Sequence, residues 1–137
     1  MKKIKSLVIG CGKLGANISD YLSKKGDDVI IVDQDPRSFR KLDVNFSGYK
    51  LIGDATDLDF LENQCDITHI NQIVITTNSD SVNLYVSHVA YFIYQIPNIY
   101  VRFIDVDKGL LIKKTNIKAS YPFDLSMKEF LDLEAKK

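Results

Sequence analysis

The sequence has no excess of charge of either sign and few side chains that bind metals. Over its 137 residues, 18 acidic residues balance 18 basic ones, so the formal net charge is zero. Because a nucleic-acid partner requires a basic face that neutralises phosphates, this balance argues against one. The cysteines are Cys11 and Cys65, the histidines are His69 and His88, and no CxxC or metal-binding spacing joins them. We therefore expect two free thiols in a reducing compartment and no metal site.

Long apolar runs are missing as well. No run approaches the roughly 20 residues that span a bilayer, so we expect no direct insertion of this chain into a membrane. No linker, low-complexity stretch or internal repeat interrupts the sequence. Since a chain of this length can bury one sizeable core but not two, we predict a single domain over residues 1–137.

What the sequence does contain is an alternation of short β-branched runs and amphipathic helical stretches. Strands are predicted at residues 5–9, 29–32, 49–52, 72–76, 99–103 and, for a short one, 117–120. Helices are predicted at about residues 13–25, 36–42, 57–65, 79–94, 107–114 and, for the last one, 125–136. Six β-α units in series indicate the α/β class, with a Rossmann-type, doubly wound, mostly parallel six-stranded sheet. Its core would cover about residues 4–125.

The spacing of apolar residues predicts the buried face of the two longest of these helices within that core. For the helix at 13–25, this face consists of Leu14, Ile18, Tyr21 and Leu22. For the helix at 79–94, the stripe toward the sheet consists of Val82, Val86, Val89 and Ile93, and the other faces carry Leu84, His88, Tyr91 and Phe92. A helix that is apolar on both sides needs a second cover. We expect a homo-oligomer, most simply a dimer, through this helix and the last one; the alternative is cover by neighbouring helices of the same chain.

A glycine-rich turn follows the first predicted strand and opens the first predicted helix, with the pattern GxGxxG from Gly10 to Gly15. Gly10 can form the tight turn, Gly12 lets backbone N–H groups approach a pyrophosphate, and Gly15 lets the helix pack closely on the sheet. About twenty residues later Asp33 ends the second strand, where its carboxylate can accept hydrogen bonds from ribose hydroxyls. A 2′-phosphate would meet this charge, so NAD should bind better than NADP. The alternative is a turn that only connects strand and helix.

Catalytic groups are not evident in the sequence. Tyr21 and Lys25 match the Tyr-x-x-x-Lys pair of short-chain dehydrogenases, but they lie roughly two to three helical turns from the glycine turn. His69 and His88 have no obvious nucleophile or carboxylate pair beside them. We therefore expect a protein that is not an enzyme and has no catalytic residues.

Four segments stand in an order that is typical of one family. They are the glycine turn, the run Asp33-Gln34-Asp35-Pro36, the run Gly53-Asp54-Ala55-Thr56 after the third strand, and the run from Thr77 to Asn83 after the fourth. Over about residues 4–125 the chain resembles the N-terminal domain of the regulators of potassium conductance, also called the TrkA-N family. The resemblance implies a cytoplasmic regulatory domain or subunit that gates a membrane potassium transporter or channel in response to bound NAD(H) or ATP/ADP. It would reach the inner face of the membrane only through that partner.

The resemblance and the position of each segment together give a set of candidate nucleotide-binding residues. Asp54 is suited to the adenine amino group and Thr56 to capping the next helix, unless both belong to a turn without a ligand. Lys13 could reach a terminal phosphate or be a solvated lysine, and Arg102 could contact an anion or form an intramolecular salt bridge. The full set is Gly10, Cys11, Gly12, Lys13, Leu14, Gly15, Asp33, Gln34, Arg37, Asp54, Ala55, Thr56, Thr77, Asn78 and Arg102.

Two other functions remain open at this point. One is the cofactor-binding part of an NAD-dependent oxidoreductase that takes its substrate from another chain. The other is an interaction module whose nucleotide site is vacant.

Overall fold

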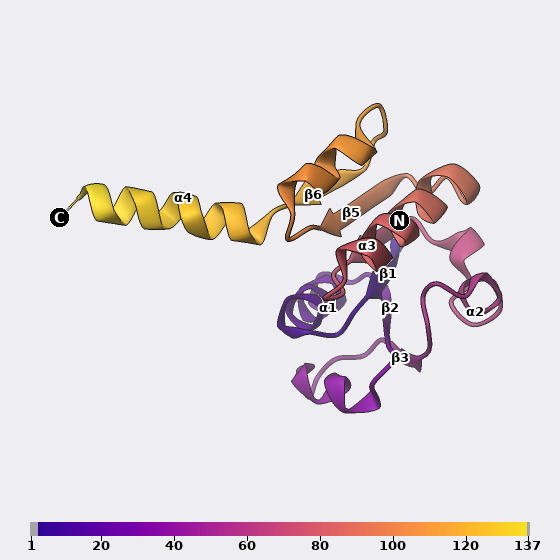
Figure 1. Ribbon diagram of the computed structural model, residues 1–137. Helices are drawn as coiled ribbons and strands as arrows, with labels where there is room; N and C mark the ends of the chain where they lie inside the picture. The colour runs from indigo at the N-terminus through magenta and orange to yellow at the C-terminus, as the bar shows by residue number, and fades with distance from the viewer. Residues whose placement is uncertain (1–2, 137) are drawn as a thin grey trace.

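The computed structural model describes residues 3–136, and a six-stranded sheet runs through its centre (Figure 1). The strands are β1 (Lys5–Ile9), β2 (Asp28–Asp33), β3 (Tyr49–Ile52), β4 (Gln72–Ile75), β5 (Asn98–Arg102) and β6 (Lys118–Ser120). Their order is β3-β2-β1-β4-β5-β6, and every neighbouring pair is parallel. The predicted Rossmann-type fold is therefore confirmed. The strand order reverses between β1 and β4, and the carboxyl ends of these two strands flank the point where such sheets bind ligands.

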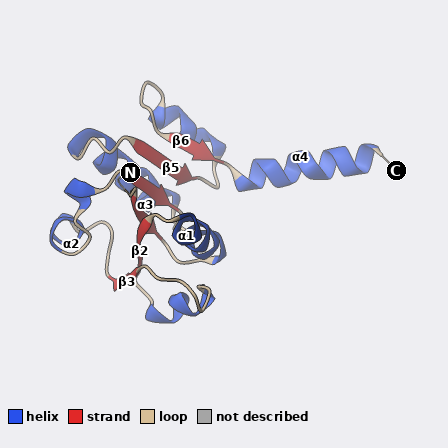
Figure 2. Cartoon of the chain, turned by 180° about the vertical axis from the view of Figure 1, so that it is seen from behind, coloured by secondary structure: helices blue, strands red, loops and turns tan. Residues whose placement is uncertain are grey.

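Helices and short helical turns cover both faces of the sheet (Figure 2). The α-helices are α1 (Lys13–Lys25), α2 (Leu58–Asn63), α3 (Asp80–His88) and α4 (Pro122–Ala135). The short turns are η1 (Pro36–Lys41), η2 (Ile67–His69), η3 (Val89–Ile93) and η4 (Val106–Ile112). One core cluster joins the sheet to α1 and η1 through Val8, Ala16 and Phe39. A larger one joins the other face to α2 and α3 through Phe60 and Val86.

Several predicted helices are shorter or tighter than expected. The segments predicted as helices at 36–42 and 107–114 are the 3₁₀ turns η1 and η4, and each begins where an aspartate, Asp35 or Asp105, accepts a bond from the backbone N–H two residues later. The helix predicted at 57–65 spans only α2. Asp57 caps α2, since its carboxylate accepts bonds from the N–H groups of Asp59 and Phe60.

The buried face of α1 differs from the prediction. Gly15, Ala16, Ser19 and Leu22 are buried, whereas Leu14 is 38% exposed and Tyr21 is 64% exposed. The predicted face was therefore wrong for Leu14 and Tyr21. The physical reason is the close approach of α1 to the sheet, which requires its smallest side chains on that side and turns larger ones outward.

The helix predicted at 79–94 is α3 followed by the π-helical turn η3, and its buried stripe is rotated from the prediction. Val86 and Val89 are buried as expected, but the stripe is centred on Asn83, Val86, Ser87 and Ala90. Ile93 is 55% exposed, so its predicted place toward the sheet was wrong. In η3 the Tyr94 N–H donates to the Val89 carbonyl, five residues earlier. This wider turn rotates Ile93 away from the sheet.

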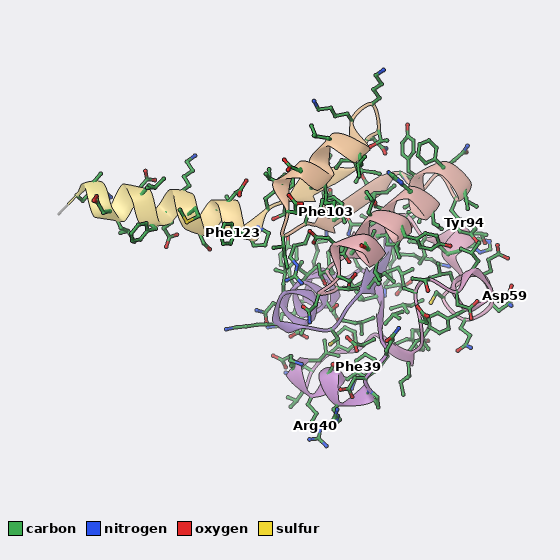
Figure 3. The ribbon with its side chains drawn as sticks, in the orientation of Figure 1. Phe39, Arg40, Asp59, Tyr94, Phe103 and Phe123 are labelled. Carbon is green, nitrogen blue, oxygen red and sulfur yellow. The ribbon has the colours of Figure 1, made fainter. Side chains whose placement is uncertain are left out.

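The last helix, α4, begins at Pro122 and projects from the rest of the molecule (Figure 1). All described residues from Phe123 to Lys136 are exposed, and the side chains of α4 surround it without another element beside them (Figure 3). No helix within residues 3–136 is long and apolar enough to cross a membrane.

Candidate functional site

A cavity of about 540 Å³ opens at the carboxyl edge of the sheet, around the reversal in strand order. It is lined by Ile9, Gly10, Gly12, Val32, Asp33, Gln34, Asp35, Ser38, Lys41, Gly53, Asp54, Ala55, Thr76, Thr77, Asn78, Ser79 and Val82. These residues come from the ends of β1 to β4, from the loops that follow those strands, from η1 and from the start of α3. The cavity thus lies at the place where open α/β sheets bind ligands.

The three glycines of the turn have different roles in this geometry. Gly10 has a φ of 99°, a left-handed conformation that favours glycine. A Cβ on Gly15 would lie 1.9 Å from the carbonyl oxygen of Gly10, so the close packing of α1 on the turn leaves no room for a side chain. A Cβ on Gly12 would meet no atom within 4 Å. Gly10 and Gly15 are therefore required by the backbone, while Gly12 leaves open space beside the N-terminus of α1.

Asp33 links the glycine turn to the loop after β2. One of its carboxylate oxygens accepts the Cys11 N–H at 2.8 Å, and the other accepts the Asp35 N–H at 2.8 Å. Each carboxylate oxygen can accept a further hydrogen bond. The half-buried Asp33 thus has a fixed orientation at the cavity wall and can still accept bonds from hydroxyl groups.

Asp54, after β3, is held in a similar way. Its Oδ1 accepts the Thr56 N–H at 2.9 Å and the Thr56 hydroxyl at 2.8 Å. Together with a hydrogen bond from the Gln34 side chain, these bonds lower the pKa of Asp54. Asp54 is therefore an ionised acceptor at neutral pH, suited to a ligand group that donates hydrogen bonds. Thr56 stands behind it, outside the cavity lining, and does not cap α2.

The loop after β4 is fixed by Asn83, which lies on the buried side of α3. The Asn83 Oδ1 accepts bonds from the Thr77 N–H and hydroxyl, and its Nδ2 donates to the carbonyls of Thr77 at 3.1 Å and Arg102 at 2.8 Å. Asn83 is 1% exposed and was missed as a residue of the site. The feature of the sequence that could have indicated its role is a polar amide at the start of a helix that packs on a sheet.

Arg102, at the end of β5, also binds the loop after β4. Its Nη2 donates to the carbonyls of Thr76 at 3.1 Å and Thr77 at 2.9 Å, and approaches Asn78 Oδ1 at 3.4 Å. Within residues 3–136, none of the salt bridges involves Arg102, so the alternative of an intramolecular salt bridge is not formed there. Arg102 also lies outside the cavity lining. Its Nη2 is thus held by carbonyl oxygens of the loop, whereas its buried Nε has no hydrogen-bond partner within residues 3–136.

Of the candidate residues, eight line the cavity together, namely Gly10, Gly12, Asp33, Gln34, Asp54, Ala55, Thr77 and Asn78. Lys13 and Leu14 are exposed on the first turn of α1, and Arg37 pairs with Asp35 at 3.0 Å. The side chain of Cys11 is buried in the core under α1, and burial and Asp33 raise its pKa to about 11. Cys11 is therefore a neutral thiol at neutral pH, and its contribution to the site is the backbone N–H that donates to Asp33.

The lining residues that were not predicted are mostly neighbours of the motifs. They are Ile9, Val32, Asp35, Ser38, Lys41, Gly53, Thr76, Ser79 and Val82. Most of them could have been predicted from their position in the sequence, because they end or follow a strand at the carboxyl edge or begin the next helical segment. Ser38 and Lys41 depend on the 3₁₀ geometry of η1, which the pattern of apolar residues does not reveal.

Comparison with known proteins gives one family and a set of similar folds. The model of the TrkA-N domain family matches residues 6–121. The Trk system potassium uptake protein TrkA of Streptomyces coelicolor is 26% identical over 111 residues, which cover 81% of this chain and 49% of that protein. This chain spans about half or less of the length of the first curated relatives that it matches.

Two solved structures illustrate the likeness in fold. The TrkA-N domain of the inner membrane protein YbaL from Escherichia coli has a TM-score of 0.80 at 13% identity, and covers 96% of this chain and 97% of that one. The Kef CTD of Shewanella denitrificans in its AMP-bound form has a TM-score of 0.71 at 24% identity, with 94% and 80% covered. At these identities the likeness shows the fold alone.

Proposed function

The chain belongs to the TrkA-N domain family, and from this premise we propose that it is a regulatory domain that binds an adenine nucleotide at the carboxyl edge of its sheet. The observation that carries the proposal is the cavity. Gly12, Asp33 and Asp54 line it together, and beside Gly12 there is open space that a ligand can fill. The N-terminus of the 13-residue α1 favours an anion such as a phosphate. The carboxylates favour donors, as ribose hydroxyls and the adenine amino group are.

The ligands of this proposal are NAD(H) or ATP/ADP, and the partner is a potassium transporter or channel in the membrane. Curated relatives in the family are potassium uptake proteins, and a solved neighbour holds AMP, which supports both parts. The domain would be cytoplasmic, and its membrane partner would hold it at the inner face of the membrane. A signal requires that two ligands bind two conformations with different affinities.

We propose no catalytic role for this site. Tyr21 and Lys25 stack on each other at the far end of α1, with the Lys25 Nζ 5.9 Å from the Tyr21 ring centre. Neither residue lines the cavity, and no histidine or tyrosine among residues 3–136 does. An oxidoreductase half-site therefore has less support than a regulatory site.

A homo-oligomer is also part of the proposal. Leu84 and Tyr91 pack against the core of their own chain, and His88 contacts the Leu111 carbonyl. Phe92 and Ile93 remain exposed, as do the apolar side chains of α4. We expect two copies to associate through these surfaces. Phe92→Lys should then shift sedimentation toward the monomer, whereas the exposed Val44→Lys should not; a wild-type chain that is monomeric at micromolar concentration would contradict this.

The nucleotide site is tested by a thermal-shift series with AMP, ADP, ATP, NAD, NADH and NADPH. A ligand at a hundred times its dissociation constant adds about 2.7 kcal/mol to stability, which corresponds to a rise of several degrees for a domain of this size. Asp54→Ala should remove most of this rise, while Asp59→Ala, an exposed carboxylate on α2 outside the cavity, should keep it. If no nucleotide raises the melting temperature, the proposed function is wrong.

A further inference from the structure

The loop between η4 and β6 lies at the edge of the sheet opposite the cavity. Because β6 runs parallel to β5, the loop that precedes it is at the amino edge, whereas the cavity opens at the carboxyl edge. The loop projects from the rest of the fold in both ribbon views (Figure 1, Figure 2). A partner at this loop would therefore leave the cavity accessible.

The segment around this loop is positively charged. Residues 108–123 contain four lysines and no aspartate or glutamate, although the whole chain has as many acidic as basic residues. Lys113, Lys114 and Lys118 are exposed, and none of the salt bridges within residues 3–136 involves them. The Lys118 Nζ lies 5.6 Å from the ring centre of Tyr100. The charge of these lysines is therefore available to an anionic partner.

Hydrogen bonds and two buried side chains fix the backbone that carries the lysines. The Thr115 hydroxyl donates to the Ile112 carbonyl and accepts the Ile117 N–H at 3.1 Å. Ile112 and Ile117 are both buried. Between them Lys114 has a φ of 67°, a left-handed conformation that glycine adopts at lower cost. The chain thus has a cationic side chain at an exposed position where the backbone alone would favour glycine.

Exposed apolar side chains accompany the lysines. Leu110 and Leu111, near the end of η4, are 60% and 54% exposed. Lysines next to exposed leucines are typical of segments that lie at a membrane interface, where the cations meet anionic headgroups and the leucines enter the apolar boundary. Arginine would suit the carboxylates of an acidic protein better, because its planar group can bind both carboxylate oxygens. Residues 108–123 contain no arginine.

From these observations we propose that a basic corner, made of Leu110, Leu111, Lys113, Lys114 and Lys118, contacts a membrane surface that contains anionic lipids. The contact is peripheral. It goes beyond the proposed nucleotide-binding function and does not depend on it. A weak contact is sufficient in a domain that a membrane partner already holds near the bilayer, because the effective concentration of lipid is then high. It would turn the cavity at the opposite edge away from the membrane.

Sedimentation of the wild-type chain with lipid vesicles, in the absence of nucleotide, tests the proposal. We expect binding to vesicles of phosphatidylcholine and phosphatidylglycerol in equal amounts, weaker binding to phosphatidylcholine alone, and a decline as salt screens the charges. A lysine near an anionic membrane contributes about fivefold to the affinity, or about 1 kcal/mol. The triple variant K113Q/K114Q/K118Q should therefore bind the anionic vesicles roughly 100-fold more weakly.

The matched control is K3Q/K24Q/K50Q, which has the same net charge but lacks three exposed lysines on or near β1 to β3. It should bind the anionic vesicles nearly as well as the wild type. Equal losses in the two triple variants, or equal binding of the wild type to both kinds of vesicle, would overturn the proposal. Tighter binding of the wild type to polyglutamate than to anionic vesicles would also overturn it and assign the corner to an acidic protein.

Two further measurements separate this contact from the nucleotide site and from misfolding. Stabilisation by adenine nucleotides should be the same in both triple variants and the wild type, so failure of one proposal leaves the other testable. L110Q/L111Q should reduce the binding that persists at high salt, whereas V44Q, which replaces a 97% exposed valine outside the corner, should not. The comparison of the two kinds of vesicle with the wild-type chain decides the outcome if a variant does not fold.

Discussion

The two halves of the sheet have the same topology, but their polar side chains bind different partners. In the half from β1 to β3, Asp33 and Asp54 bind nearby backbone groups and still face an open cavity. In the half from β4 to β6, Asp80, Asn83 and Arg102 bind the backbone of the neighbouring loop. Both halves line the cavity, the first through Asp33 and Asp54 and the second through residues 76–79, but Asp80, Asn83 and Arg102 of the second half are engaged by neighbouring backbone groups.

The largest effect is expected at the junction of the two halves, where Gly15 packs against Gly10 of the first half and Thr76 of the second. In Gly15→Ala the new Cβ would meet the Gly10 carbonyl at 1.9 Å and Thr76 Oγ1 at 2.7 Å. Because the first contact is backbone, relief requires movement of α1. We expect destabilisation at or above the upper end of the roughly 1–3 kcal/mol that overpacking costs, measured by urea denaturation.

Gly12→Ala is the matched control in the same turn. Its Cβ meets no atom within 4 Å and its φ is −77°, so the free energy of unfolding should change by less than about 0.5 kcal/mol. Nucleotide affinity should nevertheless fall, because the methyl group enters the space beside the N-terminus of α1. Equal destabilisation by both alanines would contradict the division of roles among the glycines.

A smaller effect is expected from Asn83→Ala, which disrupts only the hydrogen bonds between the loop after β4 and β5. The substitution leaves the Thr77 N–H without its acceptor and the Arg102 carbonyl without the Asn83 donor, and each such loss costs about 1–3 kcal/mol when the group stays buried. We expect a loss of about 2 kcal/mol in chemical denaturation, together with faster amide exchange at residues 76–80. Asn78→Ala, on the exposed part of the same loop, should leave stability nearly unchanged. If the two substitutions cost the same, Asn83 does not hold the loop.

The smallest effect concerns the two thiols, Cys11 in the glycine turn and Cys65 just after α2. Burial raises the pKa of Cys11 to about 11 and that of Cys65 to about 12. Since the thiolate is the reactive form, both should react slowly with a disulfide reagent near pH 8 and faster as the pH rises toward these values. A bound adenine nucleotide should slow the labelling of Cys11 and leave that of Cys65 unchanged, as measured by mass spectrometry of peptides. Equal protection of both thiols would show that the ligand acts on the whole domain.

The sequence was sufficient for the fold and for eight of the residues that line the cavity, because both depend on local patterns. Buried parallel strands appear as β-branched runs, and Gly10, Gly15 and Asp33 occupy positions that the backbone geometry determines. The faces of α1 and α3 were less predictable, since these helices bury small residues such as Ala16 and Ser87 while larger apolar ones turn outward.

The partners of polar side chains were the least predictable part. Arg102 on a strand indicated an anion or an aspartate; it pairs with no aspartate within residues 3–136, and its Nη2 binds carbonyls of the adjacent loop instead. The position of Asn83 in the motif after β4 indicated a polar group at the start of α3, but not that it would join that loop to β5. Such pairings depend on the distance between segments far apart in the sequence, and no local pattern encodes them.

The exposed helix α4 also has a consequence for how the chain behaves in dilute solution. Its 14 residues extend roughly 21 Å, and an isolated helix of this length is marginal in water. We therefore expect α4 to exchange between helix and coil, and any contact along its apolar side to shift this equilibrium toward the helix. If two copies associate through α4, as proposed above, the far-ultraviolet ellipticity of the chain should become more negative as its concentration rises.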